Sequence, residues 1–447
     1  MTAPAPTAPE ELIRRIGHEI AGALPRHRLG GGIDRQAIER IAANPALKAA
    51  LFRFVDVVPA ARSRREAADH LDALLAEADR LPPPLRTVDG LARRPATAPL
   101  VGRTATWAVR RMARQFILAE DVAGATGGLT ALWDEGAATA LDLLGEASVS
   151  EAEADAYAAR CLDALERLDR ACRGLPARPR LDGDGAGPLP RAHLSVKLSA
   201  LTPRRHPFAP ERVSADAKRR LRPIARRARE LGAHLHLDSE SLDSREAVLT
   251  TALELLAEPE FATGPSAGVV LQAYLRDADD VLDRLLAFAA TTPGRPPLLV
   301  RLVKGAYWDH EVVDARQHGW TPAVHDGQAA TDRAYEALTR RLLGARPTLR
   351  VAIASHNLRS IAHAVAHDRH GGGDGRDLEL QVLLGLGDDL RVALARRDLR
   401  VRVYCPVGDL VAGMAYLVRR LLENTASDSF LDRQAHGASV DDLVRAP

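Results

Sequence analysis

Two neighbouring arginines, Arg419 and Arg420, have the chemistry to hold one carboxylate group between them. They lie in the segment YLVRRLLEN (416–424), where a helical period brings Tyr416 and Glu423 into the same ~100° sector as the arginine pair. A guanidinium group binds a carboxylate through two parallel hydrogen bonds, which fixes the position of the ligand as well as its charge. This segment therefore indicates a small ligand that carries a carboxylate.

A second segment, RLVKGAY (301–307), has the residue types expected beside a phosphate-bearing cofactor. Arg301 and Lys304 supply positive charge at the end of an apolar run. Gly305 follows directly, and the absence of a Cβ atom allows the backbone to approach a ligand closely. The pair Gly385 and Gly387, which opens a later helical segment, is a weaker candidate for the same role.

Lysine is rare in this chain, which has four lysines among its 61 basic residues. Lys197 lies in the middle of the apolar run SVKLSA (195–200). A buried ammonium group costs several kcal/mol unless an acid neutralises it. We therefore expect an acidic partner such as Asp238 or Glu146, and either a structural ion pair or a ligand contact for Lys197.

A metal-dependent hydrolase is the main alternative. The segment HLHLD places His234, His236 and Asp238 on one face of a strand, and an H-x-H pair on a barrel strand is typical of such enzymes. His356 could add a ligand, but the last apolar segment offers Tyr404 and Cys405 and no carboxylate. Because this ligand set is incomplete, we expect no metal. The chain has neither a G-x-S-x-G motif nor a P-loop.

The elements that must position these residues alternate between short apolar segments and amphipathic helices. This alternation, repeated eight times, favours a closed (β/α)8 barrel over a doubly wound open sheet. The expected strands are 138–146, 192–200, 233–240, 268–274, 298–307, 350–357, 378–385 and 400–408. In such a barrel the site lies at the carboxyl ends of the strands, where most of the polar residues named above are expected to meet, together with Gln272, Ser355, Asn357 and Gln381.

The first part of the chain reads as a series of helices separated by proline turns. We expect a helical arm or cap over residues 1–135 and the catalytic barrel over residues 136–447. The Gly-, Asp- and Pro-rich stretch 175–190 is expected to be a surface loop.

Composition excludes several classes of protein. The 447 residues are 46% hydrophobic and 27% charged, which argues against disorder. A formal net charge of only +2 does not indicate a global nucleic-acid-binding or polybasic membrane surface. Three cysteines without a C-x-x-C pair argue against a disulfide scaffold or a cysteine-ligated metal. No apolar run is long enough for a membrane span, and we expect a cytoplasmic protein with peripheral association at the membrane as a further option.

The segments SVKLSAL, VLQAY, RLVKGAYWD, SHN, YCPVG and YLVRRLLEN follow one another as in proline dehydrogenases, and the chain resembles the proline dehydrogenase domain of bacterial proline utilization A proteins over about residues 100–431. The resemblance implies a distorted (β/α)8 barrel that holds non-covalent FAD. It implies oxidation of L-proline to Δ1-pyrroline-5-carboxylate, hydride transfer to the flavin N5 atom, and a membrane quinone as electron acceptor. A separate pyrroline-5-carboxylate dehydrogenase would use the product.

The resemblance also assigns roles to particular residues. Lys197, Arg419 and Arg420 would bind the proline carboxylate, and Arg301 would lie near the flavin N5 atom. Asp238 would hold Lys197 and Tyr404, and Glu146 would gate the mouth against Arg419. Leu383, Tyr404 and Tyr416 would shape the pocket for the substrate ring. The implied FAD contacts are Gln272, Arg301, Val303, Lys304, Gly305, Ala306, Trp308, Thr331, Ser355, His356, Asn357, Gln381 and Glu423.

Some positions depart from the family pattern. Ser355 stands where threonine is usual, and Gln328 stands where a cofactor-facing lysine is common. These changes leave the arginine pair and RLVKGAYW intact, so L-proline is the first expectation, with hydroxyproline or another cyclic amino acid as alternatives. Neither a DNA-binding segment nor an aldehyde dehydrogenase domain is recognisable in the sequence, so we expect a stand-alone enzyme that binds no nucleic acid.

Overall fold

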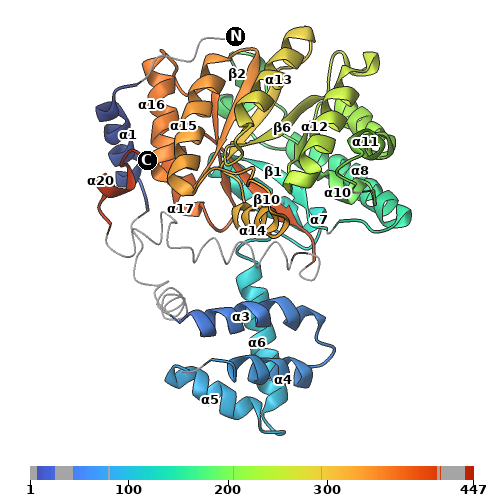
Figure 1. Ribbon diagram of the computed structural model, residues 1–447, viewed down its shortest axis with the longest axis vertical. Coiled ribbons are helices and arrows are strands. Elements are labelled where there is room, and N and C mark those ends of the chain that lie inside the picture. The colour runs from blue at the N-terminus through green and yellow to red at the C-terminus, as the bar shows by residue number, and fades with distance from the viewer. Residues whose placement is uncertain are drawn as a thin grey trace.

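Apolar residues at every second position build the strands of a closed barrel. The structure, a computed structural model, describes residues 8–25, 44–78, 81–145, 147–204, 206–292, 294–409, 413 and 438–447. Its barrel strands are β1 (Ala137–Leu143), β4 (His193–Lys197), β5 (His234–Asp238), β6 (Ser266–Gln272), β7 (Leu298–Val303), β8 (Leu349–Ala354), β9 (Leu378–Leu383) and β10 (Arg400–Val407). All neighbours are parallel, and β10 pairs with β1 to close the ring (Figure 1). The predicted (β/α)8 fold is therefore confirmed.

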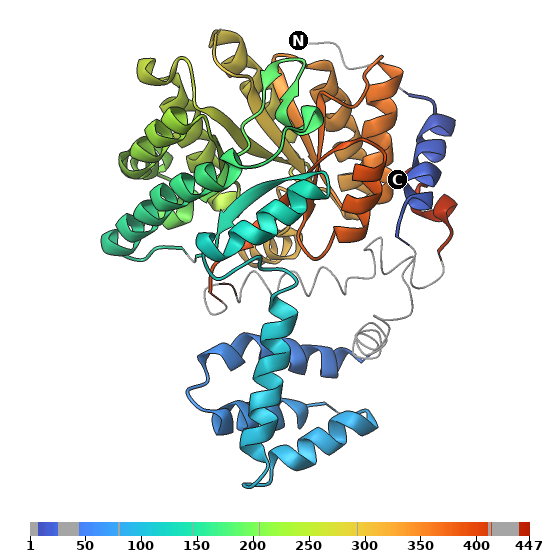
Figure 2. The same ribbon diagram turned by 180° about the vertical axis from the view of Figure 1, so that it is seen from behind.

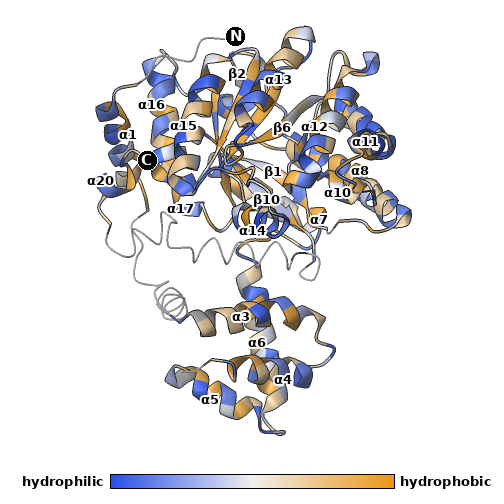
Figure 3. Cartoon of the chain, in the orientation of Figure 1, coloured by the Kyte–Doolittle hydropathy of each residue, from blue (hydrophilic) through white to orange (hydrophobic). Residues whose placement is uncertain are grey.

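Helices surround the barrel and bury the outward-facing side chains of the strands. They are α8 (Glu151–Arg173), α10 (Leu198–Leu201), α11 (Pro210–Leu231), α12 (Leu242–Ala257), α13 (Ala278–Thr291), α14 (Trp308–His318), α15 (Gln328–Gly344), α16 (Leu358–His370) and α17 (Asp388–Arg396), with the 3-10 turn η2 (Pro259–Phe261). In β10, Val401, Val403 and Cys405 join the apolar cluster under these helices, and Arg402 and Tyr404 alternate with them. Figure 3 shows the hydrophilic residues of the helices on their outer sides.

The inside of the barrel carries buried charges that neutralise one another. Arg402 on β10 donates two hydrogen bonds to Glu379 on β9, at 2.9 and 3.1 Å. Burial alone would raise the pKa of Glu379, but the charges of Arg402 and Arg400 lower it to about 2. Such pairs persist in a low-dielectric interior only when the partners are well aligned and hydrogen bonded.

The stretch 175–190 is not the simple surface loop that its composition predicts. It forms the short helix α9 (Pro179–Asp182) and the hairpin β2 (Gly183–Asp184) and β3 (Gly187–Pro188). The side chain of Asp184 is 3% exposed and accepts hydrogen bonds from Arg350 at 2.9 and 3.0 Å. Arg350 lies near the start of β8, so this hairpin supplies a carboxylate to the amino-terminal end of the barrel.

A helical unit projects from the opposite, carboxyl-terminal end of the barrel (Figures 1 and 2). We call it the arm; it comprises α3 (Pro45–Val57), the 3-10 turn η1 (Val58–Ala60), α4 (Arg64–Leu75), α5 (Pro83–Ala92) and α6 (Ala98–Ala113). The side chains of Asn44 and Ser63 cap α3 and α4 by accepting hydrogen bonds from the backbone. The apolar cluster of the arm includes two residues from the mouth of the barrel. Leu144 directly follows β1, and Leu386 lies in the turn between β9 and α17. The arm therefore packs on the mouth of the barrel.

Three further helices lie against the barrel. They are α1 (Glu10–Gly22), α7 (Val122–Asp134) and α20 (Val440–Leu443). Helix α1 packs on both α16 and α20, and Arg359 on α16 donates to Glu10 on α1 and, at 3.1 Å, to the carbonyl of Val444, which directly follows α20. Thus α1 and α7 pack with the barrel although they precede residue 136, and the division of the chain at that residue remains a prediction. None of the described helices is long and apolar enough to span a lipid bilayer.

Candidate active site at the barrel mouth

The strand ends bring five predicted or neighbouring side chains into one buried network. Arg301 on β7 donates to Asp238 on β5 at 2.5 Å, to Gln381 on β9 at 2.7 Å, and to Ser195 on β4 at 3.3 Å. The hydroxyl group of Tyr404 on β10 donates to the second oxygen of Asp238 at 2.6 Å. The guanidinium carbon of Arg301 lies 5.3 Å from the centre of the Tyr404 ring. One carboxylate therefore orients both a cation and a phenol.

Among the described residues the partner of Lys197 is Asp142 and not Asp238; Glu146, the other acid that the sequence suggested, lies outside them. The ammonium group forms an ion pair with Asp142, whose side chain is fully buried, whereas that of Lys197 is 20% exposed. Burial alone would lower the pKa of Lys197, but the charges of Asp142 and Asp238 raise it above its usual value. Asp238 instead accepts one hydrogen bond at each of its oxygens, from Arg301 and from Tyr404.

Asp142 was not predicted as a site residue, although one signal was present. It is the only charged residue within the strand AATALDL (β1), where an isolated acid among apolar residues requires a cationic partner. One of its carboxylate oxygens is buried without a hydrogen-bond partner. A donor brought by a ligand could complete the coordination of this carboxylate.

The turn after β7 carries a second group of predicted residues. Lys304 forms an ion pair with Asp332 on α15, so its charge stays at the rim of the barrel. Gly305 has a φ of 125°, a conformation that favours glycine. The indole nitrogen of Trp308 donates to the carbonyl of His325 at 2.8 Å, which fixes the start of α14. Val303 and Ala306 flank this turn and complete the segment.

Gly305→Ala is expected to destabilise the protein by roughly 1–3 kcal/mol, because the new Cβ meets both an unfavourable φ and a ring. A Cβ placed at Gly305 would lie 2.3 Å from the Tyr274 ring. Chemical denaturation would measure the loss. Gly90→Ala on α5 is the matched control, since nothing lies within 4 Å of its Cβ position. Equal stability of the two variants would contradict the expectation.

The end of β8 supplies Ser355, His356 and Asn357 in succession. His356 accepts a hydrogen bond from the backbone nitrogen of Leu383 at 2.9 Å, which ties the ends of β8 and β9 together. The Asn357 side chain caps α16 by accepting from Ser360 at 3.0 Å, and Ser355 accepts from the backbone of Asn357 at 3.0 Å. These polar groups therefore form an ordered part of the mouth.

Two predicted contacts lie at the edges of this group. Gln272 at the end of β6 accepts from Ser239 at 3.1 Å and donates to the carbonyl of Glu240 at 3.2 Å. Thr331 on α15 is buried, and its hydroxyl donates to the carbonyl of Gly327 at 3.1 Å. Neither residue makes a direct hydrogen bond to Arg301 or Lys304, so they belong to the rim and not to the central network.

A cavity of about 310 Å³ opens beside the rim. Its walls are residues of α15, among them Gln328 and Asp332, the start of α16 at Asn357, and the tail after α20, with Arg445. The cavity thus adjoins the ion pair of Lys304 and the cap of α16. Five predicted residues lie outside the described part of the chain, namely Glu146, Tyr416, Arg419, Arg420 and Glu423.

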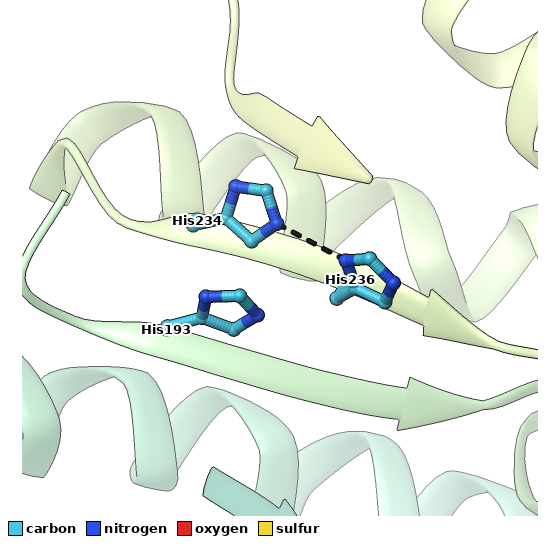
Figure 4. A group of neighbouring side chains, drawn as sticks. All are labelled: His193, His234 and His236. Atoms are coloured by element: carbon cyan, nitrogen blue, oxygen red, sulfur yellow. Dashed lines mark hydrogen bonds between the residues drawn. The ribbon is translucent and has the colours of Figure 1, made fainter. Parts of the chain in front are cut away.

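Two histidines of the metal hypothesis, His234 and His236, lie in the other half of the barrel beside His193, which the sequence analysis did not single out, whereas His356 lies at the mouth after β8. His193 and His234 begin β4 and β5, and His236 follows two residues later (Figure 4). The His234 and His236 rings approach to 3.3 Å between Nε2 and Nδ1, and the nearest nitrogens of all three lie within 4.8 Å of one another. Burial, together with nearby arginines, holds the pKa of each well below its usual value.

This histidine cluster is poorly suited to a catalytic metal. Arg301 and Arg402 act on all three imidazoles, and their positive charge also opposes a divalent cation. Catalytic sites of such barrels lie at the carboxyl ends of the strands, and this cluster begins at the amino ends. His234 and His236 therefore do not lie where the hydrolase hypothesis requires its metal ligands.

Comparison with known families accounts for most of the chain. The proline dehydrogenase family matches residues 125–433, and the family of proline utilization A N-terminal domains matches residues 10–116. The bifunctional protein PutA of Salmonella typhimurium is 33% identical over 360 residues, which is 78% of this chain and 26% of that protein. The proline dehydrogenase of Deinococcus radiodurans is 28% identical over 341 residues, covering 75% of this chain and 94% of that protein.

Solved structures agree with this assignment. Proline utilization A from Bdellovibrio bacteriovorus, inactivated by N-propargylglycine, superposes with a TM-score of 0.88 at 32% identity, covering 98% of this chain and 44% of that one. The chain thus spans less than half of that structure and about a quarter of the curated PutA relatives that it matches. The likeness includes the arm as well as the barrel.

Proposed function

The chain belongs to the proline dehydrogenase family, and from this premise we propose that it oxidises L-proline to Δ1-pyrroline-5-carboxylate. The proposal is supported above all by the network of Arg301, Asp238 and Tyr404 beside Lys197 at the carboxyl ends of the strands. Proline dehydrogenases are in general flavin-dependent, and FAD is the cofactor that we propose here. Electrons would pass to a membrane quinone, and a pyrroline-5-carboxylate dehydrogenase would use the product.

The residues at the mouth fit a flavin nucleotide. Arg301 and Lys304 supply two cations, and His356, Asn357 and Gln381 supply polar groups around them. The cavity beside Asn357 lies next to this set and offers room for part of a nucleotide. The same residues, with Gln272, Thr331 and Trp308, are the ones proposed to hold FAD. When bound, this cofactor supplies the acceptor for a hydride.

The remaining task of the protein is to orient the substrate and to keep water out. Lys197, together with Arg419 and Arg420, would bind the proline carboxylate, and Leu383, Tyr404 and Tyr416 would enclose the ring. Asp238, which is assigned to the substrate site, would position Tyr404 and Arg301 there through one hydrogen bond to each. A carboxylate held in this way places the ring carbon next to the nitrogen at a fixed distance from the acceptor, which contributes to rate through orientation. Glu146 would close the mouth against Arg419.

Anaerobic mixing of the purified holoprotein with L-proline tests the proposal directly. We expect the flavin absorbance to bleach with L-proline, and less or not at all with L-hydroxyproline or with a six-membered cyclic amino acid. Bleaching by hydroxyproline in preference to proline would redirect the substrate assignment. No bleaching with any cyclic amino acid, by a protein that contains flavin, would overturn it.

Arg419→Met and Arg420→Met are each expected to raise the KM for proline by roughly 10- to 100-fold, the cost of one charge-assisted hydrogen-bonded contact. Flavin content should stay unchanged, because neither arginine is assigned to the cofactor. Steady-state kinetics with a soluble dye as acceptor would measure the effect, with Arg212→Met on the exposed side of α11 as control. Unaltered KM values in both variants would contradict the proposed carboxylate clamp.

A further inference from the structure

We propose that one face of helix α6 in the arm docks on the surface of an anionic lipid bilayer. This inference rests on the proposed function, which requires a quinone dissolved in a membrane. We call this surface the basic face. It consists of Leu100, Arg103, Thr104, Trp107, Arg110 and Arg111 on α6, and of Arg114, which directly follows the helix.

The basic face is a single continuous strip of the helix. At 100° per residue, its members fall within a sector of about 120°. The opposite side is buried: Val109 and Ala113 belong to the apolar cluster of the arm. A Cβ at Gly102 would lie 1.8 Å from the carbonyl oxygen of Arg64, so α6 packs tightly on the start of α4. This contact fixes the rotation of α6 and keeps the basic face outward.

Two large apolar side chains stand on this face without cover. Leu100 is 55% exposed and Trp107 is 60% exposed, and they are two helical turns apart. The guanidinium carbon of Arg111 lies 5.7 Å from the centre of the Trp107 ring. A cationic helix that displays tryptophan and leucine together is typical of helices that lie in the interface of a bilayer, because the indole ring is stable at the level of the lipid headgroups.

The charge of this region is strongly positive, and among the described residues Arg93 is its one arginine that pairs with acids, namely Asp72 and Asp89. Residues 81–119 contain seven arginines and one acid, Asp89, a net charge of +6 in a chain whose total is +2. Within the described part of the chain, Arg103, Arg110, Arg111 and Arg114 form no ion pair. Anionic lipids attract such unpaired basic residues with about 1 kcal/mol each near the surface.

The position of α6 suits transfer of electrons to a membrane. The segment that follows it, at Phe116 and Ile117, shares an apolar cluster with Leu386 at the barrel mouth. The basic face extends about 21 Å from Leu100 to Arg114 along the helix axis. A bilayer held against this face would therefore lie beside the arm that leads to the mouth, where a lipid-dissolved acceptor has to arrive.

Other partners fit this surface less well. A second copy of the chain would bring like charges together on the same face, which costs free energy. A nucleic acid would satisfy the arginines through its phosphates but would leave Leu100 and Trp107 without an apolar partner. The bilayer is the partner that uses both properties of the surface.

Co-sedimentation of the holoprotein with vesicles tests the proposal. Vesicles that contain equal parts of phosphatidylglycerol and phosphatidylcholine should bind the protein, and added salt should weaken the binding. Pure phosphatidylcholine vesicles should bind it far less. Arg103→Gln/Arg111→Gln should weaken binding about 30-fold, because each arginine contributes about fivefold. Leu100→Ala/Trp107→Ala should weaken binding roughly tenfold.

Matched controls separate this surface from general effects of charge and apolarity. Arg212→Gln/Arg316→Gln removes the same charge from exposed positions elsewhere, and Trp320→Ala removes an indole that is 59% exposed at the end of α14. Both controls should bind vesicles as the wild type does. Loss of vesicle binding in the controls to the same degree as in the α6 variants would overturn the proposal. Wild-type protein that binds phosphatidylcholine vesicles as well as the anionic ones would overturn it too, as would wild-type protein that binds a DNA duplex but no vesicles.

The same variants keep failure of this inference distinct from failure of the proposed function. Proline-dependent reduction of a soluble dye does not require a membrane, so the α6 variants should retain it while they lose reduction of a quinone embedded in vesicles. A protein that oxidises proline but never binds vesicles overturns the docking surface alone. Absence of proline-dependent dye reduction overturns the proposed function, whether or not the protein binds vesicles.

Discussion

Lys197→Met is expected to lower kcat/KM for proline by about a thousandfold. If Lys197 binds the substrate carboxylate as proposed, two losses combine in this variant. A charge-assisted hydrogen bond to the substrate carboxylate contributes roughly 1.5–3 kcal/mol, and the carboxylate of Asp142 is left buried and unpaired beside a second negative group, the substrate. Steady-state kinetics with a soluble acceptor would measure the ratio, and flavin absorbance would report whether the cofactor stays bound.

A double-mutant cycle separates the two contributions. Asp142→Asn removes the buried charge, and the pair Lys197→Met/Asp142→Asn removes both partners of the ion pair. If Lys197 only neutralises Asp142, the double variant should regain stability and activity together. If Lys197 binds the substrate, the double variant should regain stability to denaturant while its kcat/KM stays low. Recovery of activity in the double variant would therefore refute a substrate contact for Lys197.

The protein is expected to lose about 4 kcal/mol of folding free energy between pH 7.5 and pH 5.5 from three histidines alone. His193, His234 and His236 are buried and have pKa values well below 6.5, the ordinary value for an exposed imidazole. Between pH 7.5 and pH 5.5 the unfolded chain binds more protons than the folded one. The contribution of the neutral histidines to the folding free energy is therefore present above the unfolded-state pKa of about 6.5 and is lost progressively as the pH falls below it. Each histidine contributes about 1.4 kcal/mol to this loss.

Denaturant titrations at the two pH values would measure this effect. His236→Asn should reduce the difference between pH 7.5 and pH 5.5 by about 1.4 kcal/mol, whatever its absolute stability. His363 on α16, whose pKa burial lowers to about 2, should add a loss of similar size. The exposed His206 is the control, and His206→Gln should leave the difference unchanged. A stability that does not vary over this range would show that the cluster is hydrated or already charged.

The eight strands were predictable because alternation of apolar and polar residues is a local property. Each expected segment contains the strand that the structure shows or overlaps most of it, and Asp238, Arg301, Gln381 and Tyr404 were expected at one rim from their places near strand ends. The partner of Lys197 was not predictable in this way. Asp238 lies in register with Lys197 on the neighbouring strand, but Arg301 reaches across the barrel and occupies it.

The role of residues 175–190 also depended on contacts distant in sequence. Their composition indicates a loop, and only the closed barrel shows that Asp184 has two arginines, Arg350 and Arg400, within reach. In the same way, the modest total charge of the chain concealed a local excess on α6, whose outward rotation is set by its packing on α4.

The order of residues along this chain determined its class of fold, the family to which it belongs and the rim at which its polar side chains gather, because periodicity and motif spacing are properties of neighbouring residues. Tertiary structure alone decided which acid neutralises which cation, that three histidines stack in one barrel wall, and which side of α6 meets solvent. Those outcomes depend on barrel closure and helix packing, which bring together side chains that are tens to hundreds of residues apart.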